Sequence, residues 1–212
     1  MIKVTYVDHM GSDLTIVNSA RVSFNKHSDS LNEKDTKLIK YLSDHNHMSP
    51  FEHCSLTVII ECPLYIRSQI HRHRTFAYNE VSRRYTSEDL QFYLPSIDDI
   101  RQQSKSNRQA SNGTVEIETA EAVRNMMLHA HIAAEKLYES LLEAGVCREQ
   151  ARGVLPQNLM TKFYMTGNLR NFAHFLELRT HDGAQKEVRD VANQLESILK
   201  DKFPVALAAL RD

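Results

Sequence analysis

Hydrophobic and polar residues alternate along short stretches of the chain and recur with helical spacing along most of the rest. Residues 2–7 alternate in this way, and residues 55–61 (SLTVIIE) form a run that is dense in β-branched side chains. Both patterns are typical of strands. Residues 159–165 (LMTKFYM) predict a further strand from their Thr, Phe and Tyr content. Helical patterns dominate the remainder, so the sequence predicts a helix-rich α+β fold.

Several segments show the spacing of three and four residues between apolar positions that is typical of a packed helix. The clearest seam runs from Ala120 to Ala144, and Gly145 predicts the end of that helix. Pro63 predicts the first turn of another helix, on which Gln69 and Arg72 would share a face because they are three residues apart. The other predicted helices cover residues 32–45, 148–154, 168–180 and 184–202.

Residues 98–115 (DDIRQQSKSNRQASNGTV) have few apolar side chains and many Ser, Asn and Gln residues. Such a segment buries too little apolar surface to offset the entropy lost on ordering it, so we expect a flexible excursion there. The sequence shows no internal repeat and no interdomain linker. Residues 1–212 are therefore expected to form a single domain that includes this excursion.

The overall charge narrows the class of protein. The formal net charge is −1 over 212 residues, and the pI is near 6.8. A protein whose whole surface binds nucleic acid usually carries a basic excess, which this chain lacks. Any positive charge that binds a ligand must therefore be local.

The sequence also bears on where the protein is located. The three cysteines form no C-x-x-C pair, the N-terminal residues lack the apolar core of a signal peptide, and no run approaches the ~20 apolar residues of a membrane span. We expect a cytoplasmic protein that does not bind a membrane.

The positive charge is concentrated in residues 69–85 (QIHRHRTFAYNEVSRRY), where four arginines and two histidines lie within seventeen positions. The segment spans the end of the helix that begins at Pro63 and a turn or extended stretch after it. Glu80, Ser82 and aromatic residues alternate with the cations, a mixture more typical of a ligand-binding surface than of a solvated helix end. The chain has no glycine-rich loop of the G-x-G-x-x-G or G-x-x-x-x-G-K-[ST] type, so side chains must hold any nucleotide. Arginine suits that task because its guanidinium group presents paired donors to phosphate oxygens.

A second polar cluster, HNHMSPFEH, groups His45, His47, Glu52 and His53. Its H-x-H-x5-H spacing is not one of the standard closed zinc patterns, and the supporting cysteine, Cys54, directly follows the last histidine. We therefore expect these side chains to have structural or ligand-contacting roles, and we expect no metal.

Three side chains are candidate nucleophiles. Ser82 could be activated by His73, although the G-x-S-x-G motif is absent. Cys62 and Cys147 lie in apolar stretches of the sequence, so we expect both to be buried core thiols.

The arrangement of the cation cluster resembles a known signature. The RHR triplet at Arg72, His73 and Arg74, followed after seven residues by Ser82, is similar to the RHR-x7-S motif of the flavin-dependent thymidylate synthases, also called thymidylate synthase-complementing proteins. The surrounding NEVSRRY resembles the N-E-x-S-x-R-Y pattern of that family. The likeness extends, in the order found in the family, to residues 20–24 (ARVSF), 47–53 (HMSPFEH), 151–158 (ARGVLPQN) and 178–185 (LRTHDGAQ).

The resemblance implies a fold, an activity and an assembly. The family fold is a helix-rich single domain with a small, mainly antiparallel sheet. Members convert dUMP to dTMP, with 5,10-methylenetetrahydrofolate as carbon donor, FAD as hydride carrier and NADPH as the reductant of FAD. They are homotetramers whose sites are shared between subunits.

The resemblance also assigns residues. The implied dUMP contacts are Gln69, Arg72, Glu80, Ser82, Arg83, Arg84, Arg152 and Arg179, with the arginines mainly at the phosphate. The implied FAD contacts are Ser49, Arg72, His73, Arg74, Glu80, Asn168, Leu169, Arg170 and His174. His47 would lie near the flavin and the folate. Arg179 is implied to be catalytic, because a fixed cation beside the uracil favours its ionised form and makes C5 a better nucleophile.

The chain departs from the common family pattern at two of these positions. Many relatives carry a small residue where Arg83 stands and an asparagine where His174 stands. Arg170 and His174 are four residues apart, so they would share a face of the predicted helix. Ser82 is implied to be a hydrogen-bonding contact and not a nucleophile.

Two other classes of function compete with the family. In a single-strand nucleic-acid binding module, cations would follow the backbone and aromatic rings would stack on bases. The residues concerned would be Arg72, Arg74, Arg84, Phe76, Tyr78 and Tyr85. The near-neutral pI and the lack of tryptophan weigh against this class. A nucleotide phosphohydrolase would need a cluster of carboxylates with metal-binding spacing, which the sequence does not show.

Overall fold

The computed structural model describes residues 1–108 and 110–212 of the chain. Its contacts group into two compact units that alternate along the sequence. Unit 1 comprises Met1, Glu61–Ile70 and Glu80–Lys162, and unit 2 comprises Ile2–Ile60, His71–Asn79 and Phe163–Asp212. The expectation that residues 1–212 form one domain stays a prediction.

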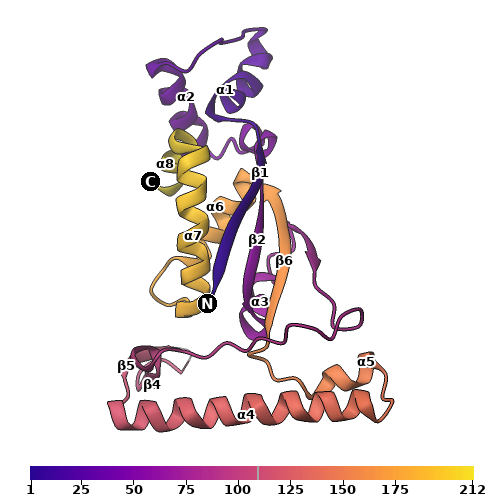
Figure 1. The fold of residues 1–212 in the computed structure, drawn as a ribbon. Helices are drawn as coiled ribbons and strands as arrows, with labels where there is room; N and C mark the ends of the chain where they lie inside the picture. The colour runs from indigo at the N-terminus through magenta and orange to yellow at the C-terminus, as the bar shows by residue number, and fades with distance from the viewer. Residues whose placement is uncertain (109) are drawn as a thin grey trace. The chain divides into compact units, whose positions relative to one another are not determined.

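The sheet is small and antiparallel, and Figure 1 shows three of its strands, β1, β2 and β6, side by side. Its strand order is β1 (Lys3–Met10), β2 (Ser55–Pro63), β6 (Met160–Asn168) and β3 (Ala77–Glu80). Alternate residues of β2, namely Leu56, Val58 and Ile60, are buried, as expected where one face of a strand meets a core. The predicted strands are confirmed, as is the helix-rich fold with a small antiparallel sheet.

The helices of unit 2 pack against one another and against β1. They are α1 (Asp13–Arg21), η1 (Val22–Phe24), α2 (Glu33–Asp44), η2 (Ser49–His53), α6 (Leu169–Arg179), α7 (Lys186–Lys202) and α8 (Pro204–Arg211). Val188, Val191 and Leu195 of α7 are buried at the predicted spacing, and this helix contacts α6, α8 and β1 (Figure 1). The structure thus confirms the helices predicted at residues 32–45, 168–180 and 184–202.

Asp13 joins α1 and α8, two helices that the sequence analysis did not predict. Its buried carboxylate accepts hydrogen bonds from the backbone N–H groups of Val205 at 3.0 Å and Ala206 at 2.9 Å, in the first turn of α8. Burial raises the pKa of Asp13, and the two hydrogen bonds oppose that rise. The carboxylate therefore satisfies backbone donors that would otherwise lack a partner at the start of the helix.

Unit 1 contains the long helix α4, which Figure 1 shows beside β4, β5 and α5. Its elements are α3 (Leu64–Ile70), η3 (Ile97–Asp99), β4 (Arg101–Gln103), β5 (Ser111–Thr114), α4 (Ile117–Glu143), α5 (Arg148–Ala151) and η4 (Arg152–Val154). The predicted long helix is confirmed, and Gly145 beyond its end has a φ of +83° that suits glycine. The prediction that the apolar seam of this helix is packed is wrong for the single chain. Two residues of that seam, Met127 and Leu137, are 37% and 50% exposed.

Residues 98–115, the expected excursion, contain a β-hairpin. Its strands β4 and β5 pair antiparallel, with Gln102 opposite Asn112 and Gln103 opposite Ser111. Gln109 lies outside the described residues. The polar composition did not exclude this pairing, because main-chain hydrogen bonds do not require apolar side chains. The flexibility of the segment stays a prediction.

Helix α3 is shorter than the sequence predicts, and it ends just before His71. Arg72 lies in the turn that follows, so it does not share a helix face with Gln69 and that prediction is wrong. The ring of His71 packs instead against Tyr78 and Phe163, with centroid distances of 4.1 and 5.0 Å. These aromatic contacts favour the turn over a further turn of helix, and they give His71 a structural role.

Phe76 lies shortly after the RHR triplet, and its ring packs against Gly167 of β6. A Cβ atom on Gly167 would lie 2.3 Å from Cδ1 of Phe76, which is buried and packs against Phe172 at a centroid distance of 4.8 Å. We predict that Gly167→Ala lowers the free energy of unfolding by about 1–3 kcal/mol, since overpacking forces the ring to move. Urea denaturation measures this change. Gly153→Ala is the matched control, because its Cβ would meet no atom within 4 Å. Equal stability of both variants would contradict the prediction.

Candidate functional site

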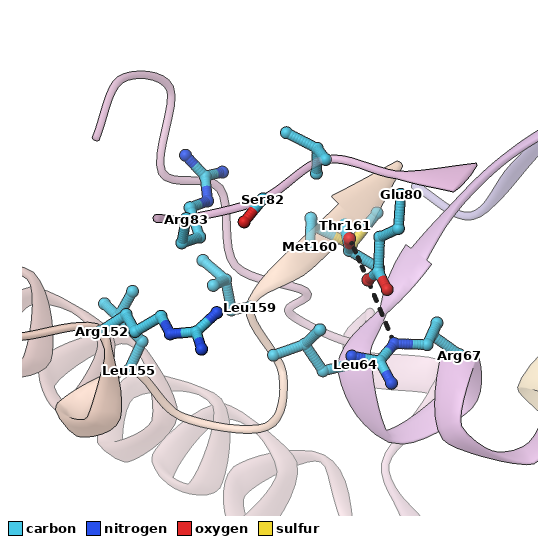
Figure 2. Close-up of a pocket in the computed structure, with 11 residues that line it drawn as sticks. Leu64, Arg67, Glu80, Ser82, Arg83, Arg152, Leu155, Leu159, Met160 and Thr161 are labelled. Atoms are coloured by element: carbon cyan, nitrogen blue, oxygen red, sulfur yellow. Dashed lines mark hydrogen bonds and ion pairs between the residues drawn. The ribbon is translucent and has the colours of Figure 1, made fainter. Parts of the chain in front are cut away.

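A pocket in unit 1 collects several of the residues predicted to contact a ligand (Figure 2). Its volume is about 340 Å³. Leucine and methionine side chains from α3, from the segment after η4 and from the start of β6 supply apolar walls. The lining residues are Leu64, Arg67, Glu80, Val81, Ser82, Arg83, Arg152, Leu155, Leu159, Met160 and Thr161.

Glu80, the last residue of β3, supplies the carboxylate of this pocket. Its Oε1 atom accepts a hydrogen bond from Nε of Arg67 at 3.1 Å and another from Oγ1 of Thr161 at 2.6 Å (Figure 2). Neither donor was predicted from the sequence, because no local pattern links Arg67 or Thr161 to Glu80.

Two further arginines line the pocket in different ways. Figure 2 shows the guanidinium group of Arg152 extending from η4 into the pocket, while its Nε donates to the backbone carbonyl of Glu149 at 3.4 Å. The guanidinium group of Arg83 donates instead to the backbone carbonyls of Glu88 and Asp89. Of these two predicted phosphate contacts, Arg152 is the one whose guanidinium group projects into the pocket.

Of the other predicted dUMP contacts of unit 1, Ser82 lines this pocket, and Gln69 and Arg84 do not. The hydroxyl oxygen of Ser82 accepts a hydrogen bond from the backbone N–H of Arg84 at 3.3 Å. The side chain of Arg84 is exposed and lies 3.9 Å from Glu149, outside the lining. Gln69 on α3 is half-buried and is also outside the lining.

The composition of the pocket indicates what it can bind. Three guanidinium groups outnumber one carboxylate, so the pocket favours an anionic ligand. Ser82 and Glu80 add hydrogen-bonding groups, and the apolar side chains suit the face of a ring. A small phosphorylated molecule with a heterocycle matches these properties.

Unit 2 brings together Arg179 and His73, which lie 106 positions apart in the sequence. Nε of Arg179 donates to Nε2 of His73 at 3.0 Å, so Nε2 is the acceptor and the ring is neutral. Burial, together with the charges of Arg179 and His174, lowers the pKa of His73 to about 4. Burial also lowers the pKa of Arg179, which is half-buried. The structure thus holds a cation in place with a neutral histidine that also contacts the ring of Phe175, 4.7 Å away between centroids.

A larger hollow of about 880 Å³ lies in unit 2. Arg170 and His174 of α6 both line it, which confirms that they share a helix face. Nη1 of Arg170 forms an ion pair with Glu52 at 2.6 Å, and Nδ1 of His174 lies 3.3 Å from Glu177. The residues that line the hollow are Asn46, Met48, Glu52, Thr75, Arg170, Asn171, Ala173, His174, Glu177, Leu210, Arg211 and Asp212.

The remaining predicted FAD contacts of unit 2 differ in exposure. The side chain of Asn168 accepts a hydrogen bond from the backbone N–H of Asn171 at 2.9 Å and so caps α6. The side chain of Leu169 is buried in the core. The residues that are exposed are Ser49, Arg72 and Arg74, together with His47, the predicted flavin and folate neighbour.

The two cysteines that were predicted to be buried differ in their exposure. Cys62 is buried, as predicted, and burial together with the charge of Glu80 raises the pKa of its thiol to about 12. Cys147 is exposed at the N-cap of α5, so the prediction that it is buried is wrong. Its apolar sequence neighbours did not decide its burial, because it lies in the connection between α4 and α5.

Two features are missing from the ranges that the structure describes, 1–108 and 110–212. There, no group of three or more His, Cys, Asp or Glu residues is placed to hold a metal ion. No helix within the same ranges is long and apolar enough to cross a membrane.

Known proteins resemble this chain over nearly its whole length. A model of the thymidylate synthase complementing protein family matches residues 5–205. A flavin-dependent thymidylate synthase from Thermus thermophilus is 42% identical over 210 residues, which are 99% of this chain and 75% of the relative. A flavin-dependent thymidylate synthase from Wolbachia pipientis wMel is 37% identical over 206 residues, which are 97% of this chain and 72% of the relative.

A solved structure has the same fold. The UMP/dUMP methylase PolB from Streptomyces cacaoi, bound with 5-Br dUMP, superimposes with a TM-score of 0.89 at 35% identity. The match covers 99% of this chain and 94% of the other. The same methylase bound with 5-Br UMP gives a TM-score of 0.89 at 34% identity. The residues that line the pocket of unit 1 all lie within residues 5–205, the range that the family model matches.

Proposed function

Because the chain belongs to the thymidylate synthase complementing protein family, the flavin-dependent thymidylate synthases, we propose that it methylates dUMP to dTMP with the help of FAD. The observation that carries this proposal is the pocket of unit 1. There, the family motif residues Glu80 and Ser82 line the same space as Arg152, a guanidinium group suited to a phosphate.

The finer steps extend this proposal. We infer that 5,10-methylenetetrahydrofolate donates the carbon unit and that NADPH supplies the reducing equivalents. FAD, when bound, supplies the hydride chemistry of the flavin. The residues of the chain would bind and orient the ligands and place charge beside the reacting ring.

The phosphate of dUMP would be held mainly by Arg152, whose guanidinium group projects into the pocket. Arg83 would join it after releasing the carbonyls of Glu88 and Asp89. The hydroxyl group of Ser82 would donate a hydrogen bond and not attack the substrate. The remaining proposed contacts are Gln69, Arg72, Glu80, Arg84 and Arg179.

Arg179 is the proposed catalytic residue. Its hydrogen bond with His73 fixes the guanidinium group, and partial burial strengthens its field because nearby water screens it less. A fixed cation beside the uracil favours the ionised ring, whose C5 is then the better carbon nucleophile. The neutral state of His73 matters here, since a second positive charge would repel Arg179.

Unit 2 presents groups that would hold FAD. Arg170 lies in the first turn of α6, and after releasing Glu52 its guanidinium group, with the positive end of the helix, would bind an anion such as a pyrophosphate. The hollow beside it has a volume of about 880 Å³ and is lined by His174 as well. The remaining proposed FAD contacts are Ser49, Arg72, His73, Arg74, Glu80, Asn168 and Leu169, with His47 near the flavin and the folate.

A homotetramer would explain the apolar surface of α4. Ile117, Met126 and Leu137 are 66%, 70% and 50% exposed, which is unusual for large apolar side chains along one helix. We propose that other copies of the chain cover this surface, and that each ligand site receives residues from more than one chain. Location in the cytoplasm stays a prediction.

The nucleic-acid alternative is less consistent with the aromatic residues of the motif. Phe76 is buried against Phe172, and the hydroxyl group of Tyr78 donates to the carbonyl of His73 at 2.9 Å. Tyr85 is 80% exposed. Of the three rings proposed to stack on bases, Tyr85 alone is therefore well placed to do so.

The proposed activity predicts a yellow protein that binds about one FAD per chain. After anaerobic reduction of the flavin with NADPH, adding dUMP and methylenetetrahydrofolate should reoxidise it and form dTMP. Absorbance at the flavin bands and chromatography of the nucleotides measure both events. Omitting dUMP is the control and should give no dTMP. A colourless protein that binds no added FAD would contradict the proposal.

A further inference from the structure

The carboxylate of Glu80 is held from one side only. Nε of Arg67 and Oγ1 of Thr161 both donate to its Oε1 atom, at 3.1 and 2.6 Å. No residue in the described ranges 1–108 and 110–212 donates a hydrogen bond to Oε2. One oxygen thus anchors the group, and the other keeps its capacity to accept a hydrogen bond from a ligand.

The two donors to Glu80 come from two different elements of regular secondary structure. Arg67 lies on α3 and Thr161 on β6, and all three residues line the pocket of unit 1. Thr161 is buried, and the side chains of Arg67 and Glu80 are 31% and 21% exposed. A carboxylate fixed by a cation and by a buried hydroxyl group loses rotational freedom before any ligand arrives, which favours ligand binding.

We propose that Arg67, assisted by Thr161, is a positioning residue that orients the Glu80 carboxylate to accept a hydrogen bond from an N–H or O–H donor of the bound nucleotide. This inference rests on the proposed function, since the nucleotide is taken to be dUMP. It assigns to Arg67 an effect on ligand binding that acts through Glu80.

A contact that only stabilised the fold would have different consequences. A partly exposed ion pair contributes about 0–1 kcal/mol to stability and would not alter ligand affinity selectively. A positioning residue alters affinity only while the group that it positions is present. The two roles are therefore separated by asking whether the effect of Arg67 depends on Glu80.

The test measures the dissociation constant of dUMP by titration of the FAD-loaded protein, together with KM and kcat for dTMP formation. We expect Arg67→Met to weaken dUMP binding about tenfold, and Thr161→Val, which keeps the shape of the side chain, to weaken it about threefold. Arg67→Lys should restore most of the affinity, because an ammonium group also donates to a carboxylate. In a Glu80→Gln background, Arg67→Met should change the affinity by less than about twofold.

Lys162→Met is the matched control, since Lys162 follows Thr161 on the same strand and lies 4.0 Å from a different carboxylate, that of Glu61. It should bind dUMP like the wild type. Should Arg67→Met fail to fold, Thr161→Val with and without Glu80→Gln answers the same question. Independent effects of Arg67→Met and Glu80→Gln, or wild-type affinity in Arg67→Met, would overturn the inference. A wild-type protein that does not bind dUMP would instead overturn the proposed function.

Discussion

Arg179→Ala is expected to retain FAD and to lose dTMP formation by about 100- to 1,000-fold in kcat. Removing one fixed group that stabilises a developing negative charge costs about this much in other enzymes. Here the guanidinium group is half-buried and fixed by His73, so water cannot readily replace its field. Single-turnover formation of dTMP from the reduced, FAD-loaded enzyme measures the loss without interference from product release.

The same variant should change the titration of His73. Burial is the main cause of its low pKa of about 4, and the charge of Arg179 is the second. Without that charge the pKa of His73 should rise but stay below the ordinary value of 6.5, because burial persists. Nuclear magnetic resonance of the imidazole ring measures this shift and shows that the substitution acted where intended.

Two further variants complete the test of Arg179. Arg179→Lys keeps a positive charge and should retain more turnover than Arg179→Ala, although it loses the rigid planar donor. Lys200→Ala removes an exposed cation from α7 in the same unit and should leave turnover unchanged. Unaltered turnover in Arg179→Ala would show that the residue has no catalytic role. Loss of FAD would assign it to cofactor binding.

Patterns that repeat within a few residues were the parts of the fold that the sequence could predict. Arg170 and His174 share a face of α6 because their spacing matches one turn of helix, and that spacing is visible in any helical segment. The contact of Arg179 with His73 joins residues 106 positions apart, and no local pattern indicates it. The resemblance to the family named both residues, but it did not say that they touch each other.

Helix ends and uncovered faces were harder to predict because distant residues decide them. The helix from Pro63 was expected to continue through Arg72, and it stops earlier because the ring of His71 packs on Phe163 from β6. The seam of α4 was identified from its spacing, but spacing shows which side chains share a face and not what covers them. Leu137 is exposed in the single chain for that reason.

In the pocket of unit 1, too, distant residues that the sequence did not indicate complete the site. The motif located Glu80, but its donors Arg67 and Thr161 lie 13 residues before it and 81 residues after it. Their types, an arginine and a threonine, are common on any surface. They become informative only when the fold brings both to one carboxylate oxygen.

Arg152→Ala is expected to weaken dUMP binding about 100-fold and to raise KM, while kcat at saturating dUMP changes little. Charge-assisted hydrogen bonds contribute roughly 1.5–3 kcal/mol each, and a loss of about 2.8 kcal/mol corresponds to a factor of about 100. The guanidinium group of Arg152 extends into the pocket (Figure 2), and Glu149 contributes a backbone carbonyl that holds its Nε. Because this charge would act on the phosphate and not on the uracil, its removal affects ground-state and transition-state binding equally.

Binding of deoxyuridine, which lacks the phosphate, tests whether Arg152 acts through the phosphate of dUMP. If Arg152 binds the phosphate, Arg152→Ala and the wild type should bind deoxyuridine with equally low affinity, so the difference seen with dUMP disappears. Arg148→Ala is the matched control, because it removes an arginine from the neighbouring helix α5, outside the pocket lining, and should bind dUMP like the wild type. An unchanged dissociation constant for dUMP in Arg152→Ala would remove the residue from the site. An equal loss for dUMP and deoxyuridine would mean that Arg152 shapes the pocket rather than binding the phosphate.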